Sequence, residues 1–261
     1  MGAQTRESLE SVAGLAGSAR VDAAALAGLL QAGRALASYP SLLAALADSS
    51  HEAADRTALL DGAMGSLEKS ARGLLDRVVE LSWSAPADLL QGIEEYGVRL
   101  AAGLGSVDTV VSQLLGLSRV IRQNAELQLA LSDKRASAES KHSIVVALGA
   151  KKMDPVALEV AAHIAALPRG RRASEALVDA AELVCQQDGR GLAEVQVATE
   201  PSAAQLTSIQ GLLAKKFGTE CYLDVVITPE VIGGARIRVG DVVMDGSVHT
   251  QLGEMRRQLA S

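Results

Sequence analysis

The sequence is poor in aromatic residues and in cysteine. Only 2% of its 261 residues are Phe, Trp or Tyr, so the bases of a single-stranded nucleic acid would find almost no side chains on which to stack. Cys185 and Cys221 are the only cysteines. Two are too few for a disulfide framework or a zinc site made of thiolates, and this usage fits a reducing cytoplasm. We expect both to be small core residues.

The sequence also has no excess of positive charge. The net charge is -6 and the pI is about 5.3, whereas proteins that bind nucleic acid or anionic lipid present basic surfaces. No apolar run reaches the roughly 18 residues of a membrane-spanning helix. The opening residues, MGAQTRESLESV, carry charge at Arg6, Glu7 and Glu10 where a secretory signal would be apolar. We therefore expect a soluble globular protein whose partners are proteins and not nucleic acids.

Motifs of covalent catalysis and of metal binding are absent as well. No GxSxG sequence and no nearby Cys-His pair indicates a nucleophile. The HExxH spacing of a zinc site is not formed by the four histidines, His51, His142, His163 and His249. We expect no catalytic residues, no cofactor and no metal.

Charged residues give no catalytic signal either. The basic run PRGRR, Pro168 to Arg172, is followed within two helical turns by Glu175 and Asp179. We interpret the run as the solvated start of a helix and not as an anion site. No carboxylate stands in an apolar context that would shift its pKa for proton transfer.

Alanine and leucine dominate the first two-thirds of the chain, and their spacing is helical. Both residues adopt the helical conformation at a low cost in free energy. Leu26, Leu29 and Leu30 recur at the three- and four-residue spacing of one helix face, and Pro86 stands where the next such stripe begins. The pattern predicts a helical bundle that extends to about residue 187.

The helical region also resembles itself at an offset of 85 residues. Leu42–Leu60 aligns without a gap with Leu127–Val145, and the alignment pairs Asp48 with Asp133. Such self-similarity indicates a tandem duplication of a helical unit.

The same offset predicts where the two copies meet. We expect the first copy over residues 1–105 and the second over residues 86–190. Helix 87–104 would be shared, because the position of the last helix of the first copy coincides with that of the first helix of the second. A shared helix would join the two copies rigidly.

After Gly189 the spacing of apolar residues changes from helical to alternating. Val195 and Val197 alternate with polar residues, as in a half-buried strand. Ser202 and Gln205 form the capping-box pattern that opens a helix. We expect residues 191–261 to form a small α/β domain, so that the chain as a whole is α+β and mostly α.

The glycines of VIGGARIRVGDVVMDGS, Val231 to Ser247, could cradle a phosphate or turn one strand back on another. A phosphate loop needs GxxxxGK[ST] or GxGxxG ahead of a helix, and neither occurs. Gly240 opens a two-residue loop, at the position where a hairpin turn needs positive φ. We predict a hairpin over residues 235–244 and a terminal helix over 248–259. In the hairpin, Val239 lies opposite Val242, buried Ile237 opposite Met244, and Arg236 opposite Asp245.

This stretch resembles a known family. VIGGARIRVGDVVMDGSVHTQLGEMRRQL is similar to the C-terminal signature of the delta subunit of F-type ATP synthase, called the oligomycin-sensitivity-conferring protein in mitochondria. In that signature a glycine pair, a strand, Gly-Asp, a strand ending in Asp-Gly-Ser and a leucine-bearing helix follow one another. EEYGVRLAAGL and GRRASEALVDAAELV also resemble the family's first and sixth helices. The matching signature residues are Gly233, Gly234, Gly240, Asp241, Asp245, Gly246, Ser247 and Leu252.

The resemblance implies a structural subunit of the peripheral stalk that performs no catalysis. Its helical domain would hold the N-terminal helices of the alpha subunits, and its C-terminal domain the distal end of the b subunit. It would lie on the cytoplasmic face of the plasma membrane and associate with the membrane only through the complex. The candidate partner-binding residues are Leu9, Val12, Leu74, Val78, Leu252 and Leu259.

Two questions stay open at this point. Members of the family ordinarily have one helical domain, so either copy could hold the alpha helices. The alternative to a stalk subunit is a helical adaptor or regulatory module with a ligand-binding α/β domain.

Overall fold

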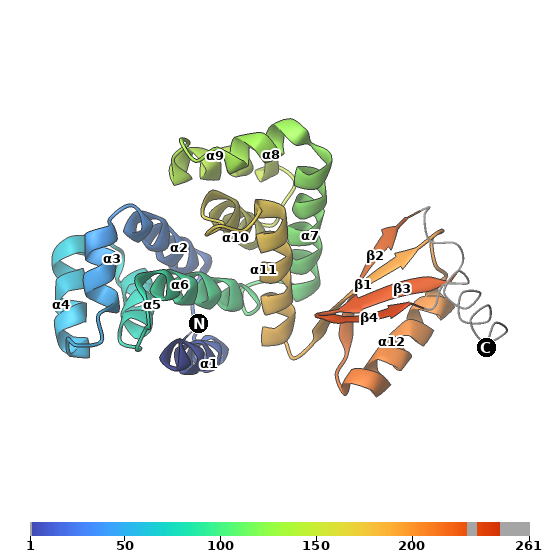
Figure 1. The fold of residues 1–261 in the computed structure, drawn as a ribbon, viewed down its shortest axis with the longest axis horizontal. Helices are drawn as coiled ribbons and strands as arrows, with labels where there is room; N and C mark the ends of the chain where they lie inside the picture. The colour runs from blue at the N-terminus through green and yellow to red at the C-terminus, as the bar shows by residue number, and fades with distance from the viewer. Residues whose placement is uncertain (1, 229–233, 246–261) are drawn as a thin grey trace, which may run out of the picture. The chain divides into compact units, whose positions relative to one another are not determined.

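The computed structural model describes residues 2–228 and 234–245. These residues belong to two compact units, Met1–Gln187 and Asp188–Ser261, which we call the helical domain and the C-terminal domain (Figure 1). The described residues are mostly helical and include one small sheet. The predicted α+β, mostly α fold class is therefore confirmed.

The helical domain consists of short amphipathic helices, many of which begin at a side-chain cap or a proline. Asp22, for example, accepts a hydrogen bond from the Ala25 N–H at 2.8 Å, which satisfies a donor that the first helical turn leaves unpaired. In chain order the helices are α1 (Ala3–Ser18), α2 (Ala23–Ala37), α3 (Pro40–Ala47), α4 (Ala53–Met64), α5 (Lys69–Val79), α6 (Pro86–Ala101), α7 (Val107–Gln123), α8 (Ala125–Ser132), α9 (Ala138–Gly149), α10 (Pro155–Ala166) and α11 (Ala173–Gln187).

The sequence repeat recurs in the lengths and the buried faces of the helices. The bounds of α3 and α8 differ by 85 at both ends, as do those of α4 and α9. The other pairs, α1 with α6, α2 with α7, α5 with α10 and α6 with α11, agree with this offset to within two residues. Helices α2 and α7 also bury equivalent positions. The buried residues of α2 whose counterparts in α7, 85 residues later in the chain, are also buried are Ala25, Leu26, Leu29, Leu30, Ala32, Gly33 and Leu36.

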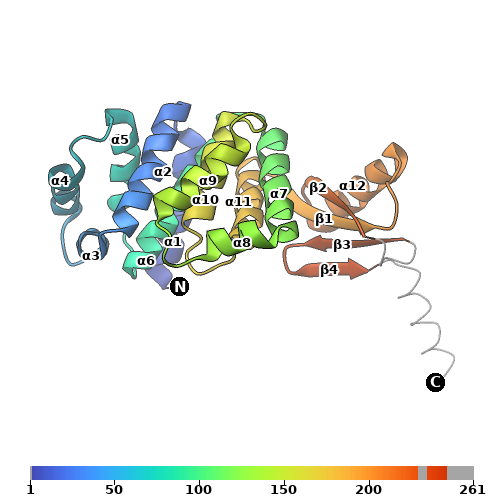
Figure 2. The same ribbon diagram turned by 90° about the horizontal axis from the view of Figure 1, so that it is seen from above.

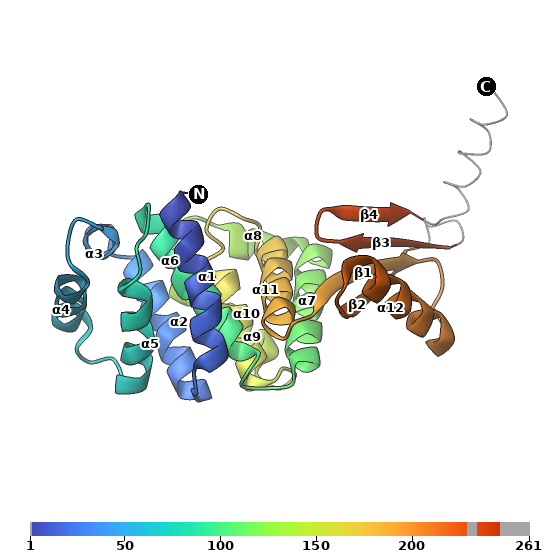
Figure 3. The same ribbon diagram turned by 90° about the horizontal axis from the view of Figure 1, so that it is seen from below.

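Helix α6 has contacts on both sides of the repeat. It packs against α1, α2, α3 and α5, and also against α10 and α11, in the middle of the helical domain (Figures 1 and 3). Gly92 of α6 allows the ring of Trp83 to lie directly against the helix backbone. Trp83 is only 2% exposed, and its Nε1 donates a hydrogen bond to the Val78 carbonyl at 2.9 Å.

The C-terminal domain is a four-stranded sheet with one helix in the described residues. Its elements are β1 (Gly191–Val197), α12 (Ala203–Phe217), β2 (Cys221–Ile227), β3 (Ala235–Val239) and β4 (Val242–Asp245). The strand order is β2-β1-β3-β4. Strand β1 pairs with β2 in parallel and with β3 in antiparallel orientation, and β3 pairs with β4 in antiparallel orientation. A parallel pair needs a crossover, and α12 provides it.

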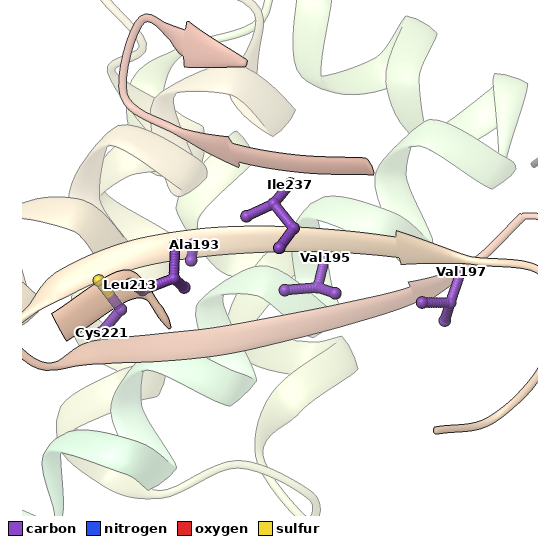
Figure 4. Packing of buried hydrophobic residues seen from close by; sticks show 6 residues of the cluster. All are labelled: Ala193, Val195, Val197, Leu213, Cys221 and Ile237. Atoms are coloured by element: carbon purple, nitrogen blue, oxygen red, sulfur yellow. The ribbon is translucent and has the colours of Figure 1, made fainter. Parts of the chain in front are cut away.

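The core of this domain is small and apolar. Alternate residues of β1 point toward one side of the sheet, where Leu213 of α12 covers them (Figure 4). Cys221 belongs to this core and Cys185 is buried in the helical domain, so both cysteines are core residues, as predicted. The buried members of the cluster are Ala193, Val195, Val197, Leu213, Cys221 and Ile237.

Two local predictions for this domain are confirmed. Ser202 and Gln205 form the capping box of α12, with both hydrogen bonds present. The β3–β4 register places Val239 opposite Val242, Ile237 opposite Met244 and Arg236 opposite Asp245. The predicted terminal helix 248–259 lies outside the described residues.

Candidate partner-binding surfaces

The glycine motif builds the β3–β4 hairpin. Gly240 and Asp241 connect the two strands, and Gly240 has a φ of 54°, a conformation that residues with a Cβ adopt at a cost. Gly234, with a φ of 78°, directly precedes β3, and Asp245 is the last residue of β4. The remaining motif residues, Gly233, Gly246 and Ser247, lie outside the described residues, as do the candidates Leu252 and Leu259.

A cavity of about 490 Å³ lies beside α12 in the C-terminal domain. Residues at the end of β1, in the first turns of α12 and around Gly234 line it. None of the described lining residues is ionisable. Such a lining offers neither an acid nor a base for catalysis.

The four described candidates for partner binding lie on α1 and α5. Val12 and Val78 have no exposed surface and Leu74 is 5% exposed, whereas Leu9 is half-buried. Three of the four are thus core residues, because α1 packs on α6 and α5 packs on α2 and α6. Of these four, only Leu9 offers a partner appreciable accessible surface.

Side-chain hydrogen bonds hold α1 in this position. Thr5 Oγ1 donates to Asp88 Oδ2 at 2.7 Å, and Ser8 Oγ donates to the Ser82 carbonyl at 2.6 Å. Both hydroxyls are buried. These bonds fix the orientation of α1 on α6 and so the direction in which Leu9 faces.

A buried arginine of the first copy joins α2 to α9 and α10 of the second. Arg34 of α2 is 6% exposed, and its guanidinium lies 3.1 Å from Glu159 Oε1 and 3.7 Å from Glu139 Oε2. His142 Nε2 lies 3.4 Å from the other oxygen of Glu159. We call Arg34, Glu139, His142 and Glu159 the Arg34 cluster.

A second ionic cluster surrounds Glu94 of α6. Glu94 is 4% exposed and accepts hydrogen bonds from Arg169 Nε at 3.0 Å, from Arg169 Nη2 at 2.6 Å and from Arg171 Nη2 at 2.7 Å. Burial alone would raise the pKa of Glu94, but the hydrogen bonds and charge of Arg169 and the charge of Arg171 outweigh it and lower the pKa. A carboxylate held ionised in this way is a structural group and not a proton donor.

The Glu94 cluster corrects two interpretations of the sequence. Arg169 and Arg171 of the PRGRR run do not lie at a solvated helix start, because they are paired with a buried carboxylate, while Arg172 is 73% exposed. Glu94 is also a carboxylate inside the domain, which sequence analysis did not find. Arg169 and Gly170, in the turn before α11, adopt positive φ values of 51° and 82°.

His163 of α10 is a buried titratable group with a shifted pKa. It is 1% exposed. Burial lowers its pKa to about 4, and the charge of Glu94 only partly opposes this effect. The imidazole is therefore neutral at pH 7.

Two further features bear on function. Within residues 2–228 and 234–245, no group of three His, Cys, Asp or Glu side chains is placed to hold a metal ion. Over the same residues, no helix has the length and apolar character needed to cross a membrane.

Comparison with known proteins identifies relatives over the whole chain. A family model described as ATP synthase delta (OSCP) subunit matches residues 98–259. ATP synthase subunit delta of Leifsonia xyli subsp. xyli is 35% identical over 263 residues, which cover 100% of both chains. ATP synthase subunit delta of Nocardioides sp. is 33% identical over 237 residues, 89% of this chain and 86% of that one. A chain in the cryo-EM structure of the Toxoplasma gondii mitochondrial ATP synthase hexamer matches with a TM-score of 0.41 and 19% identity, over 64% of this chain and 96% of that one.

The two kinds of match differ in where they begin. The family match starts at residue 98, near the end of α6, and so contains α7 to α11. Helices α1 to α5 precede it, but the Leifsonia protein matches them too. The region that precedes the family match is therefore shared with a relative. The chain belongs to the ATP synthase delta (OSCP) subunit family, whose members are structural and non-catalytic subunits of the peripheral stalk of F-type ATP synthase.

Proposed function

We propose that this protein connects the catalytic head of the ATP synthase to its peripheral stalk. The helical domain binds N-terminal helices of the alpha subunits, and the C-terminal domain binds the distal end of the b subunit. The observation that carries this proposal is the match to a delta subunit over 100% of both chains, which includes both domains. The protein works at the cytoplasmic face of the plasma membrane and reaches the membrane only through the complex.

A connector of this kind needs rigidity and docking surfaces, not an active site. Helix-in-groove docking uses an apolar surface between amphipathic helices. Leu9 of α1 is the described candidate with accessible side-chain surface, whereas Val12, Leu74 and Val78 are buried. Leu252 and Leu259 are the corresponding candidates for the b subunit.

We also propose that α6 closes the first helical copy and opens the second. Its contacts with α1, α2, α3 and α5 on one side and with α10 and α11 on the other support this role. Residues 1–105 should then unfold cooperatively on heating, whereas residues 1–84, which lack α6, should not. Equal stability of the two fragments would assign α6 to the second copy alone.

Copurification from cells that assemble the complex tests the main proposal. The full-length protein should retain both the alpha and b subunits. Leu9→Asp should weaken retention of alpha without affecting b, since a carboxylate is costly to desolvate in an apolar interface. The matched control is Leu129→Asp on α8, a 73% exposed leucine of the second copy, which should retain both. Recovery of neither subunit with the unaltered protein, or loss of alpha by the control alone, would refute the assignment.

A further inference from the structure

Helix α2 of the first copy covers a face of the second copy to which another helix could otherwise bind. It packs against both α6 and α10, and Figure 2 shows it beside α10. In the repeat, α6 and α10 correspond to α1 and α5 of the first copy, since their bounds agree at an offset of 85 to within two residues. The face under α2 is therefore equivalent to the one that carries the candidates on α1 and α5.

Residue by residue, the offset identifies this second face. Leu9 and Val12 correspond to Glu94 and Gly97, and Leu74 and Val78 correspond to Glu159 and His163. We call Glu94, Gly97, Glu159 and His163 the second-copy face.

Three of these four residues lie against α2. A Cβ added at Gly97 would collide with the side chain of Leu30. A Cβ added at Gly33 would lie 3.5 Å from His163 Cε1 and 3.0 Å from Ile93 Cγ2. Small residues on both helices thus allow close approach of their backbones. Glu159, the third residue of the face in contact with α2, pairs with Arg34 at 3.1 Å.

The chemistry of the second-copy face matches α2 and differs from that of the first copy. Arg34 is 6% exposed and lies between Glu159 and Glu139, whose equivalents in the first copy are Leu74 and Ala54. An apolar helix placed over the second-copy face would leave Glu159 without its cation, and a half-buried unpaired charge is unfavourable. The second-copy face is suited to a helix that carries an arginine, and α2 is such a helix.

We propose that α2 is the resident helix of the second-copy face, so that the second copy receives no partner helix there and a partner helix binds the first copy on α1, where Leu9 keeps accessible surface. The additional copy would thus fill this face, of which Glu159 and His163 lie in the part of the chain that the family model matches, and would offer α1 instead. The second half of this inference rests on the proposed function, and the first half does not.

The occupancy of the face by α2 can be tested on the full-length chain without any partner. The His163 ring, identified in NMR spectra by its loss in His163→Val, should titrate near pH 4 because α2 excludes water from it. Titration near its ordinary value of 6.5 would mean that the face is open in solution, and would overturn the proposal.

The binding site of a partner helix is tested by amide hydrogen exchange with a synthetic peptide of the alpha-subunit N-terminus. Amides of α1 around Leu9 should exchange more slowly when the peptide is bound, and those of α2 and α10 should not change. Slower exchange in α10 with faster exchange in α2 would show that the peptide displaces α2 and would overturn the proposal. A peptide that binds nowhere on the chain would count against the proposed function and against the first copy as the docking site, while the His163 titration still decides whether α2 occupies the second-copy face.

Discussion

Arg169 donates two hydrogen bonds to Glu94, from Nε at 3.0 Å and from Nη2 at 2.6 Å. Arg171 reaches the same carboxylate and also pairs with Asp179 at 2.9 Å. The cluster ties the loop before α11 to α6, the helix that contacts both copies of the repeat. Removal of its one buried anion would leave two guanidinium groups without their shared partner.

Glu94→Gln should therefore destabilise the helical domain at pH 7. We expect a loss of about 2–3 kcal/mol in urea unfolding, below the usual cost of breaking a fully buried pair because both arginines are partly exposed. The matched control is Glu175→Gln, which removes an exposed pair with Arg172 and should change stability by less than about 0.5 kcal/mol. Equal effects of the two substitutions would contradict a structural role for Glu94.

His163 should make the helical domain sensitive to acid. Its folded-state pKa of about 4 lies below its ordinary value of 6.5, so the unfolded chain binds a proton between these values and the folded chain does not. Stability should fall as the pH decreases from 6.5 to 4, by up to about 3 kcal/mol. His163→Val, which introduces the residue of the equivalent position Val78, should remove this part of the pH dependence. Unfolding midpoints measured across this range would contradict the assignment if both proteins had the same slope.

Gly92 should not tolerate a side chain, because the Trp83 ring lies against it. Gly92→Ala should cost about 1–3 kcal/mol through overpacking. Gly116 of α7 has no atom within 4 Å of an added Cβ, and Gly116→Ala should stabilise the domain by about 0.5–1 kcal/mol through helix propensity. Thermal unfolding of the two variants should therefore shift in opposite directions, and a shared direction would argue against close packing of Trp83 on α6.

Gly240 should be required for the hairpin. With a φ of 54°, Gly240→Ala should cost the C-terminal domain about 1 kcal/mol, and Gly240→Asn less, because asparagine adopts positive φ more readily. Calorimetry of the full-length protein would measure both. A stabilising alanine would show that the turn differs from the one described.

Features with a local signal could be predicted from the sequence. The capping box of Ser202 and Gln205 can be recognised from four consecutive residues. Gly240 marks a hairpin turn, and the register of the two strands beside it follows from their alternation. The helix bounds recur at the offset of 85 because similar helix starts and apolar spacings recur along the sequence. In each case the residues that determine the structure are close in the chain or are repeated along it.

Long-range packing could not be predicted in this way. Glu94 and Arg169 are 75 residues apart, and nothing near either one indicates the pairing. Val12, Leu74 and Val78 fit an exposed helix stripe as well as a core, and only the packing of α1 and α5 shows that they are buried. Arg34 resembles its counterpart Arg119 in sequence, but Arg34 is buried between Glu139 and Glu159, whereas Arg119 is half-buried.

The most direct test of the connector role is crosslinking of lysines in the assembled ATP synthase, followed by mass spectrometry. Exposed lysines mark the parts of the chain: Lys69 begins α5 of the first copy, Lys151 and Lys152 follow α9 of the second, and Lys215 and Lys216 end α12. The account predicts crosslinks from Lys69 to the alpha-subunit N-termini and from Lys215 or Lys216 to the b subunit. Crosslinks from the alpha-subunit N-termini to Lys151 or Lys152 without any to Lys69, or from the b subunit to Lys69, would contradict it.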